Sequence, residues 1–174
     1  AEFRFRCVKF RFPKLFFRKC MDEGTINTGI ARSTRDRVKM AVSDDPFARQ
    51  AITTFKVLER FDSTRFDDGY TLVECHLFTG RTHQIRVHMR HINHACVGDP
   101  LYGKCDARAD QGLTRQFLHS WRVAFDHPVT GERIERRDEL PWDLAAVLDD
   151  LAPRSLGRTA AGDEIVPQLG LLEA

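Results

Sequence analysis

The sequence predicts an α+β domain with a mainly antiparallel, mixed sheet and few helices. Segments rich in β-branched and aromatic residues recur along the chain, and polar stretches separate them. Helical periodicity is confined to short segments. The 174 residues suit a domain with a core of its own, and no apolar run approaches the roughly eighteen residues of a membrane helix.

Strands are expected in both halves of the chain. Residues 3–12 alternate Phe with cations, which is typical of a strand with one apolar face. Residues 51–61 and 70–78 are separated by a polar stretch and predict an antiparallel pair with a long turn. Residues 117–128 predict another strand, and residues 129–137 predict a hairpin turn into its partner.

Three further segments have weaker or different patterns. Residues 24–45 are small and polar and predict a loop, in which four cations gather: Arg32, Arg35, Arg37 and Lys39. Residues 141–152 predict a short helix that begins at Pro141. Weak patterning in residues 151–174 predicts a loosely ordered tail.

The segment 78–103 holds four of the seven histidines and no acidic residue before Asp99. Its start predicts a helix that Thr79 or Thr82 caps. The apolar positions of this helix are Ile85, Met89 and Ile92.

Three functions remain open for this helix from its residues alone. It can be a solvated basic face, or a metal site at His88 and His91 with Cys96 nearby. The third is contact with phosphates or with an active-site carboxylate, because the planar fork of arginine suits both; its candidates are Arg81, Arg86 and Arg90.

Charge and cysteine content indicate how the protein could bind a polyanion and in which compartment it is expected. The net charge is only +2, although the first twenty residues carry seven cations and one acid, so a surface for a polyanion must come from local clusters. Five cysteines without a close pair favour a reducing compartment, and we expect a cytoplasmic protein.

The strings "TGRTHQIRVHMRHINHACVGDPLYG" and "LHSWRVAFDHPVTGE" closely resemble the C-terminal half of the catalytic domain of RluA-type RNA pseudouridine synthases. The earlier strings "GTINTGIARSTRDRVKMAVS" and "AITTFKVLERF" resemble the family's preceding segments. The resemblance implies a catalytic-domain part at 24–150, after an unmatched basic, Phe-rich segment at 1–23 and before the tail at 151–174.

The resemblance also implies an activity. The family isomerises uridine to pseudouridine in structured RNA such as rRNA or tRNA, without a metal or cofactor, using an aspartate as nucleophile. The target uridine leaves its stack, which requires a pocket and a cationic rim. No membrane partner is expected.

The matching motif positions imply site residues. Arg86 is implied to pair with the catalytic aspartate and hold it ionised. The implied substrate pocket consists of Arg81, Thr82, His83 and Ile85, and the implied RNA-binding cations are Arg32, Arg35, Arg37, Lys39 and Arg90. Asp99 and Tyr102 match a Gly-Asp-Pro-x-Tyr-Gly turn that we expect to be structural.

The family's His-Arg-Leu-Asp motif and the tyrosine of its next strand are missing from the sequence. We therefore expect a fragment that is inactive alone, in which Arg86 has no nucleophile to pair with. The alternative is a non-catalytic RNA-binding module derived from the same fold. Such a module would bind structured RNA even after Arg86→Ala.

Overall fold

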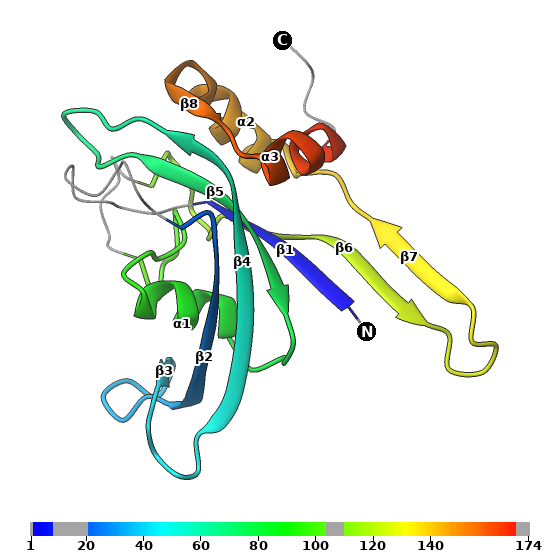
Figure 1. The fold of residues 1–174 in the computed structure, drawn as a ribbon. Coiled ribbons are helices and arrows are strands. Elements are labelled where there is room, and N and C mark those ends of the chain that lie inside the picture. The colour runs from blue at the N-terminus through cyan, green and yellow to red at the C-terminus, as the bar shows by residue number, and fades with distance from the viewer. Residues whose placement is uncertain (1, 9–20, 104–109, 170–174) are drawn as a thin grey trace.

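One antiparallel sheet organises the molecule (Figure 1). The structure is a computed structural model that describes residues 2–8, 21–103 and 110–169. The strands are β1 (Glu2–Val8), β2 (Glu23–Arg32), β3 (Met40–Val42), β4 (Arg49–Phe61), β5 (Tyr70–Leu77), β6 (Leu118–Asp126), β7 (Arg133–Arg137) and β8 (Ser155–Arg158). Their order is β3-β2-β4-β5-β1-β6-β7, with β8 paired to β4. The predicted α+β class is confirmed, and every strand pairing is antiparallel.

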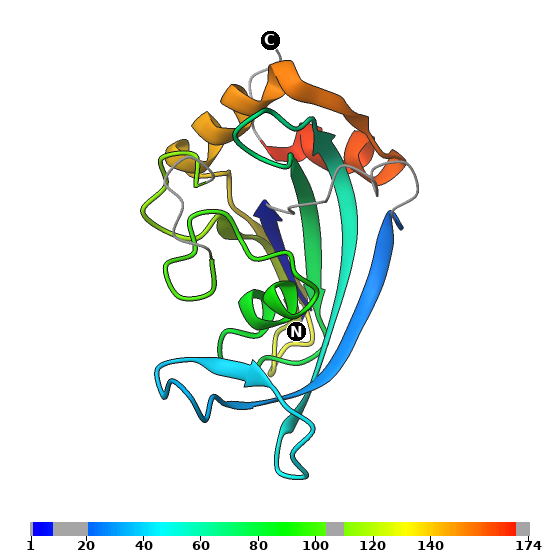
Figure 2. The same cartoon turned by 90° about the vertical axis from the view of Figure 1, so that its left-hand side faces the viewer.

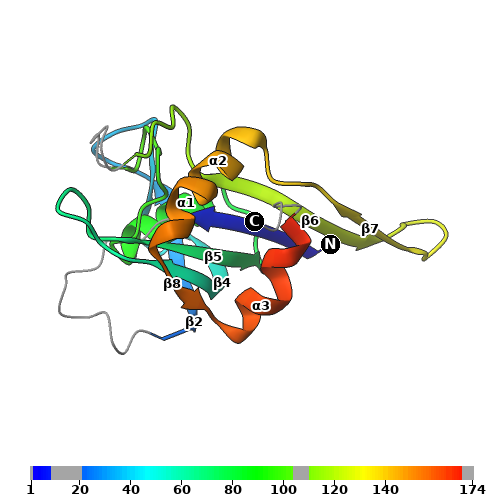
Figure 3. The same ribbon diagram turned by 90° about the horizontal axis from the view of Figure 1, so that it is seen from above.

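Helices lie on both faces of the sheet. They are α1 (Gln84–His91), α2 (Trp142–Leu151) and α3 (Ala160–Ile165), with 3-10 turns η1 (Ala152–Arg154) and η2 (Val166–Leu169). Successive β5 residues point to opposite faces: Val73 and Cys75 pack with α1, whereas Tyr70 and Leu72 pack with α2 and α3. Figure 3 shows α2 and α3 above one end of the sheet. No helix in the described ranges has the length and apolar character needed to cross a bilayer.

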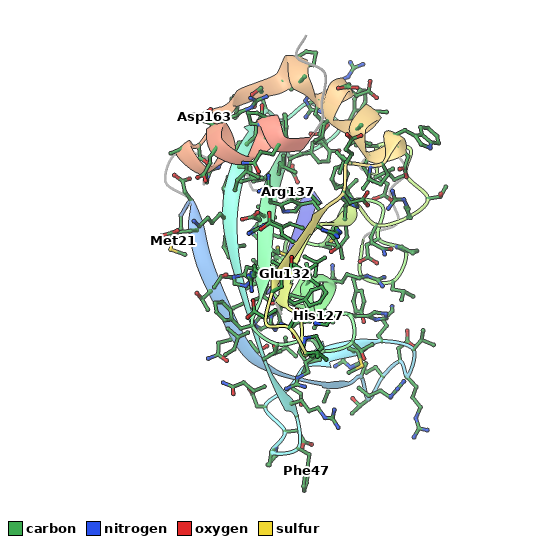
Figure 4. All side chains as sticks on the ribbon, turned by 90° about the vertical axis from the view of Figure 1, so that its right-hand side faces the viewer. Met21, Phe47, His127, Glu132, Arg137 and Asp163 are labelled. Carbon is green, nitrogen blue, oxygen red and sulfur yellow. The ribbon has the colours of Figure 1, made fainter. Side chains whose placement is uncertain are left out.

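Most of the predicted elements are present. The strand pair at 51–61 and 70–78 is β4 with β5, and the hairpin after residue 117 is β6 with β7. The start of 3–12 forms β1, which lies between β5 and β6, while residues 9–12 lie outside the described ranges. Figure 4 shows the β6–β7 hairpin through its labelled His127 and Glu132, and Phe47 at the far tip of the β3–β4 loop.

The predicted loop at 24–45 is wrong for most of its length. Residues Glu23–Arg32 form the ten-residue strand β2, which pairs with β4 from Glu23 to Ile30. Small residues are required here because a Cβ on Gly29 would lie 2.5 Å from the Ser43 carbonyl oxygen. Low β-propensity is therefore overridden by close pairing with neighbouring backbone.

The predicted loosely ordered tail is wrong for residues 151–169. β8 pairs with β4, and Thr159 caps α3 by accepting a hydrogen bond from the Gly162 N–H. Ile165 and Val166 are buried in the core beneath α2 and α3. These apolar residues were too few and too scattered to show a period, but one face of the sheet supplies the apolar surface that they cover. Residues 170–174 of the predicted tail lie outside the described ranges.

Candidate active site on the α1 face

The loop that enters α1 is fixed to the sheet by the side chain of Gln84. Its Oε1 accepts hydrogen bonds from Thr79 Oγ1 at 2.8 Å and from the Arg81 N–H at 3.0 Å. Its Nε2 donates to the Ile52 carbonyl and to Thr53 Oγ1, both at 3.0 Å. Gln84 is only 2% exposed, so these bonds replace water completely. The start of α1 is therefore placed by β4.

The helix itself was predicted, but its cap was not. α1 begins at Gln84, and the N-cap position is occupied by His83 in the left-handed region, with φ 57° and ψ 20°. Thr79 donates to Gln84 and accepts from the Ile52 N–H, and Thr82 is exposed. Neither threonine caps the helix. The polar groups of the loop, the Thr79 hydroxyl and the Arg81 N–H, instead donate to the Gln84 side chain.

Arg86 forms a buried bidentate ion pair with Asp99. Arg86 Nε donates to Asp99 Oδ2 at 2.8 Å, and Nη2 donates to Oδ1 at 2.7 Å. The two side chains are 10% and 0% exposed. Burial raises the pKa of Asp99, but hydrogen bonds from Arg86 and from two backbone N–H groups outweigh it, so the pKa lies below its usual value. The pairing of Arg86 with Asp99, a residue of the same chain, was not foreseen from the sequence.

Asp99 has the structural role that the turn motif predicts. Its Oδ1 also accepts from the N–H of Leu101 at 2.9 Å and of Tyr102 at 3.0 Å, as in an Asx turn. With no exposed side-chain surface and both oxygens engaged, Asp99 is not placed to attack a ribose carbon. Among the described residues it is nevertheless the carboxylate that holds Arg86 in position.

His88 is buried inside the same face and is bonded at both ring nitrogens. Thr53 Oγ1 lies 2.8 Å from Nδ1, and Thr28 Oγ1 lies 3.1 Å from Nε2. Burial, and to a smaller extent His91, lowers the pKa of His88 to about 4. A metal site at His88 and His91 would have to break these bonds. In the described ranges, no cluster of three His, Cys, Asp or Glu side chains is suited to hold a metal ion.

Tyr102 joins the α1 face to the strand after the arginine-rich loop. Its hydroxyl accepts from the Met40 N–H at 2.8 Å and lies 2.9 Å from His83 Nδ1. Its ring lies 4.9 Å from the Arg86 guanidinium carbon. Sequence reasoning placed Tyr102 in a structural turn and missed this connection. The signal was its place in the motif turn, but its partners are 62 and 19 residues away.

The predicted RNA-binding cations differ in how available they are. Arg32, Arg35 and Arg37 are exposed in or beside the loop at 33–39, although one Arg32 nitrogen donates to the Arg37 carbonyl. The Lys39 Nζ lies 3.4 Å from an Asp36 carboxylate oxygen, so an ion pair within the loop partly neutralises its charge. Arg90 is exposed on the last turn of α1. Figure 2 shows α1 on the sheet with β3 and its loops below it.

The four predicted pocket residues do not share one environment. Arg81 is half-buried and its Nε donates to the Gln50 carbonyl at 3.0 Å, while Thr82 is exposed. His83 is half-buried against Tyr102. Ile85 is 4% exposed within the cluster that α1 forms with the sheet, so little of its surface is available to a base. The loop side chains, and not Ile85, form the accessible part of the site.

The helix α1 lies within a segment that matches a known protein family. Residues 13–91 match the family described as RNA pseudouridylate synthase, and the match begins inside the segment 1–23 that we expected to be unrelated. The chain is 45% identical over 130 residues to the uncharacterized RNA pseudouridine synthase YlyB of Bacillus subtilis (strain 168), which covers 75% of this chain and 39% of the relative. It is 44% identical over 138 residues to the ribosomal large subunit pseudouridine synthase D of Xanthomonas campestris pv. campestris, over 74% of this chain and 39% of the relative.

Solved structures show the same fold. The human RNA pseudouridylate synthase domain containing 1 matches with a TM-score of 0.70 and 23% identity, over 97% of this chain and 65% of that one. The human RNA pseudouridylate synthase domain containing 4 matches with a TM-score of 0.60 and 20% identity, over 87% and 62%. The matched part of the chain spans about two fifths of the length of the two bacterial relatives, YlyB and the synthase D of Xanthomonas campestris.

Proposed function

The chain belongs to the RluA-type family of RNA pseudouridine synthases, and on this premise we propose that its α1 face binds structured RNA during the isomerisation of uridine to pseudouridine. We further propose ribosomal large-subunit RNA as the substrate, because several relatives carry that substrate in their names. The chemistry requires no cofactor from this face, only a pocket, a cationic rim and an ionised carboxylate. The protein is proposed to act in the cytoplasm.

One observation carries the proposal. Through the Tyr102 hydroxyl, the helix that bears Arg86 is joined to Met40, directly after the loop that exposes Arg35 and Arg37. The family motif and the cationic loop therefore belong to one supported face. RNA backbone bound at the loop would place an extruded base near the start of α1, where Arg81, Thr82 and His83 are proposed to shape its pocket.

Arg86 is proposed to hold the catalytic aspartate of the family with the nitrogen atoms that Asp99 leaves available. A guanidinium has five N–H groups, and Asp99 engages one on Nε and one on Nη2. The edge formed by Nη1 and the second Nη2 hydrogen can receive another carboxylate. Asp99 would then orient Arg86, and Arg86 would keep the nucleophile ionised.

RNA binding is the first test. Binding of the 174-residue chain to a structured large-subunit rRNA fragment should weaken with salt, since each phosphate contact releases counterions. The double substitution Arg35→Ala and Arg37→Ala should reduce the slope of log K against log salt by about 1.5. Arg65→Ala is the matched control, because Arg65 is also exposed but lies in the loop at the other end of β4. Absence of salt-dependent binding would contradict the proposal.

Activity is tested separately. The sequence has no His-Arg-Leu-Asp motif, so the chain alone should form no pseudouridine, whereas addition of a polypeptide carrying that motif from a relative should restore it. Arg86→Lys should abolish the restored activity, because lysine cannot bridge two carboxylates in a plane. Pseudouridine formed by the pure chain would overturn the assignment of the nucleophile. Binding without restored activity would favour the non-catalytic RNA-binding module.

A further inference from the structure

The hydrogen bonds of Tyr102 determine the protonation state of His83. The Tyr102 hydroxyl accepts from the Met40 N–H, so its own proton is available for one acceptor. The neighbouring acceptor is His83 Nδ1, 2.9 Å away. If Nδ1 carried a proton instead, the hydroxyl would receive two donors, and its own proton would lack an acceptor among the described residues. Tyr102 is only 6% exposed, so an unpaired proton there would be costly.

Nδ1 is therefore the acceptor, and the hydrogen of the neutral ring lies on Nε2. Burial, followed by the positive charge of Arg86, lowers the pKa of His83, while Asp99 opposes the shift. These are the charged groups that act on the ring from α1 and from the Asp99 turn. The Tyr102 ring meets the imidazole edge-on, with centroids 5.6 Å apart and planes at 80°. His83 is thus a neutral group beside a fixed cation.

His83 Nε2–H has no acceptor among the described residues. The residue lies in the left-handed backbone region, with φ 57°, where Asn, Asp and His occur more often than other side chains with a Cβ. The Gln84 bonds to the Arg81 N–H and to β4 hold the flanking backbone on both sides. The surrounding structure therefore fixes the backbone of His83, and the side chain presents one donor.

We infer that Tyr102 and the Met40 N–H hold His83 as an uncharged hydrogen-bond donor whose Nε2–H binds a phosphate oxygen of RNA between α1 and the loop at 33–39. The inference rests on the proposed function. A phosphate oxygen is the fitting acceptor because Met40 directly follows the loop that exposes Arg35 and Arg37. A neutral donor can fix the position of the RNA backbone on the protein without adding charge beside Arg86. In this scheme Tyr102 is a positioning residue.

The tautomer is tested in the free protein, independently of RNA. Long-range proton–nitrogen NMR of the 174-residue chain should show His83 with hydrogen on Nε2 only. Tyr102→Phe removes the hydroxyl while keeping the ring, and should give a mixture of both His83 tautomers. A wild-type spectrum with hydrogen on Nδ1, or an unchanged spectrum in Tyr102→Phe, would overturn the inference.

The contact is tested by the salt dependence of binding to the rRNA fragment. His83→Phe should weaken binding about five-fold, the value of one hydrogen bond, with no change in salt slope, because a neutral donor releases no counterion. Arg37→Ala should reduce both affinity and slope. His91→Phe, at an exposed position of the same helix, should change neither. His83→Asn, which tolerates the left-handed backbone but is too short to reach the same oxygen, guards against misfolding of the Phe variant.

The outcomes separate the two proposals. An affinity loss with a smaller slope would mean that His83 binds as a cation, and unchanged affinity in both His83 variants would mean that it makes no contact; either result overturns the inference. A wild-type chain that fails to bind the RNA contradicts the proposed function and with it the phosphate contact.

Discussion

Removal of the charge on Asp99 should cost much more stability than the same change at Asp143. Both aspartates form bidentate pairs with arginine, Asp99 with Arg86 and Asp143 with Arg115, and all four N–O distances lie between 2.7 and 2.8 Å. The geometry is therefore matched. The two environments differ in burial. The Arg86 and Asp99 side chains are 10% and 0% exposed. Those of Arg115 and Asp143 are 41% and 25% exposed.

The expected magnitudes follow from this difference in burial. Asp99→Asn leaves a guanidinium in a nearly dry site without a counter-charge, which costs about 3 to 5 kcal/mol. Asp143→Asn removes a pair that water already screens and should cost about 1 kcal/mol or less. With a urea m-value of about 2 kcal/mol/M, the midpoint should fall by about 2 M for Asp99→Asn and by less than about 0.5 M for Asp143→Asn.

The assay is urea unfolding followed by circular dichroism for the two variants and the wild-type chain. An unchanged m-value in all three would show that the variants differ in stability and not in the extent of unfolding. Equal losses at the two sites would refute the argument from burial. The double substitution Arg86→Met with Asp99→Leu should recover part of the stability lost in Asp99→Asn, because no buried charge is left unpaired.

Three further predictions concern the same face. The pKa of His88 is about 4 in the folded chain, as is that of His94, against about 6.5 in the unfolded chain, so the unfolded chain binds more protons between these values. Each ring should lower the stability by about 3 kcal/mol as the pH drops from 6.5 to 4, measured by urea midpoints, and a flat profile would contradict the burial of neutral rings. Gln84→Ala, which removes four hydrogen bonds of a buried side chain, should cost about 3 kcal/mol in thermal unfolding, whereas Gln50→Ala at an exposed amide should stay within about 0.5 kcal/mol. Gly29→Ala places a Cβ 2.5 Å from the Ser43 carbonyl oxygen and should cost about 1 to 3 kcal/mol of stability. Gly80→Ala, with no atom within 4 Å of its Cβ, should be close to neutral, and similar losses of stability in the two variants would show that crowding does not decide the effect.

The sequence by itself determined the elements whose pattern is local. β-Branched and aromatic runs predicted β4 and β5, Pro141 marked the start of α2, and the spacing of Ile85 and Met89 predicted α1. The string from Gly80 to Arg86 was sufficient to indicate the family. Each of these signals lies within a window of about a dozen residues, which is the range over which periodicity and capping act.

The tertiary structure decided everything that depends on a distant partner. Glu23–Arg32 is a strand because β4 lies beside it, although its own residues favour a loop. Asp99 supplies the counter-charge for Arg86, and burial lowers the pKa of His88, whose ring nitrogens lie within hydrogen-bond distance of Thr53 and Thr28. Hydrogen bonds and burial depend on which atoms meet in space, and the distance between residues along the sequence does not encode that. The motif therefore indicated the α1 face as a candidate site, but not the hydrogen bonds that this face makes.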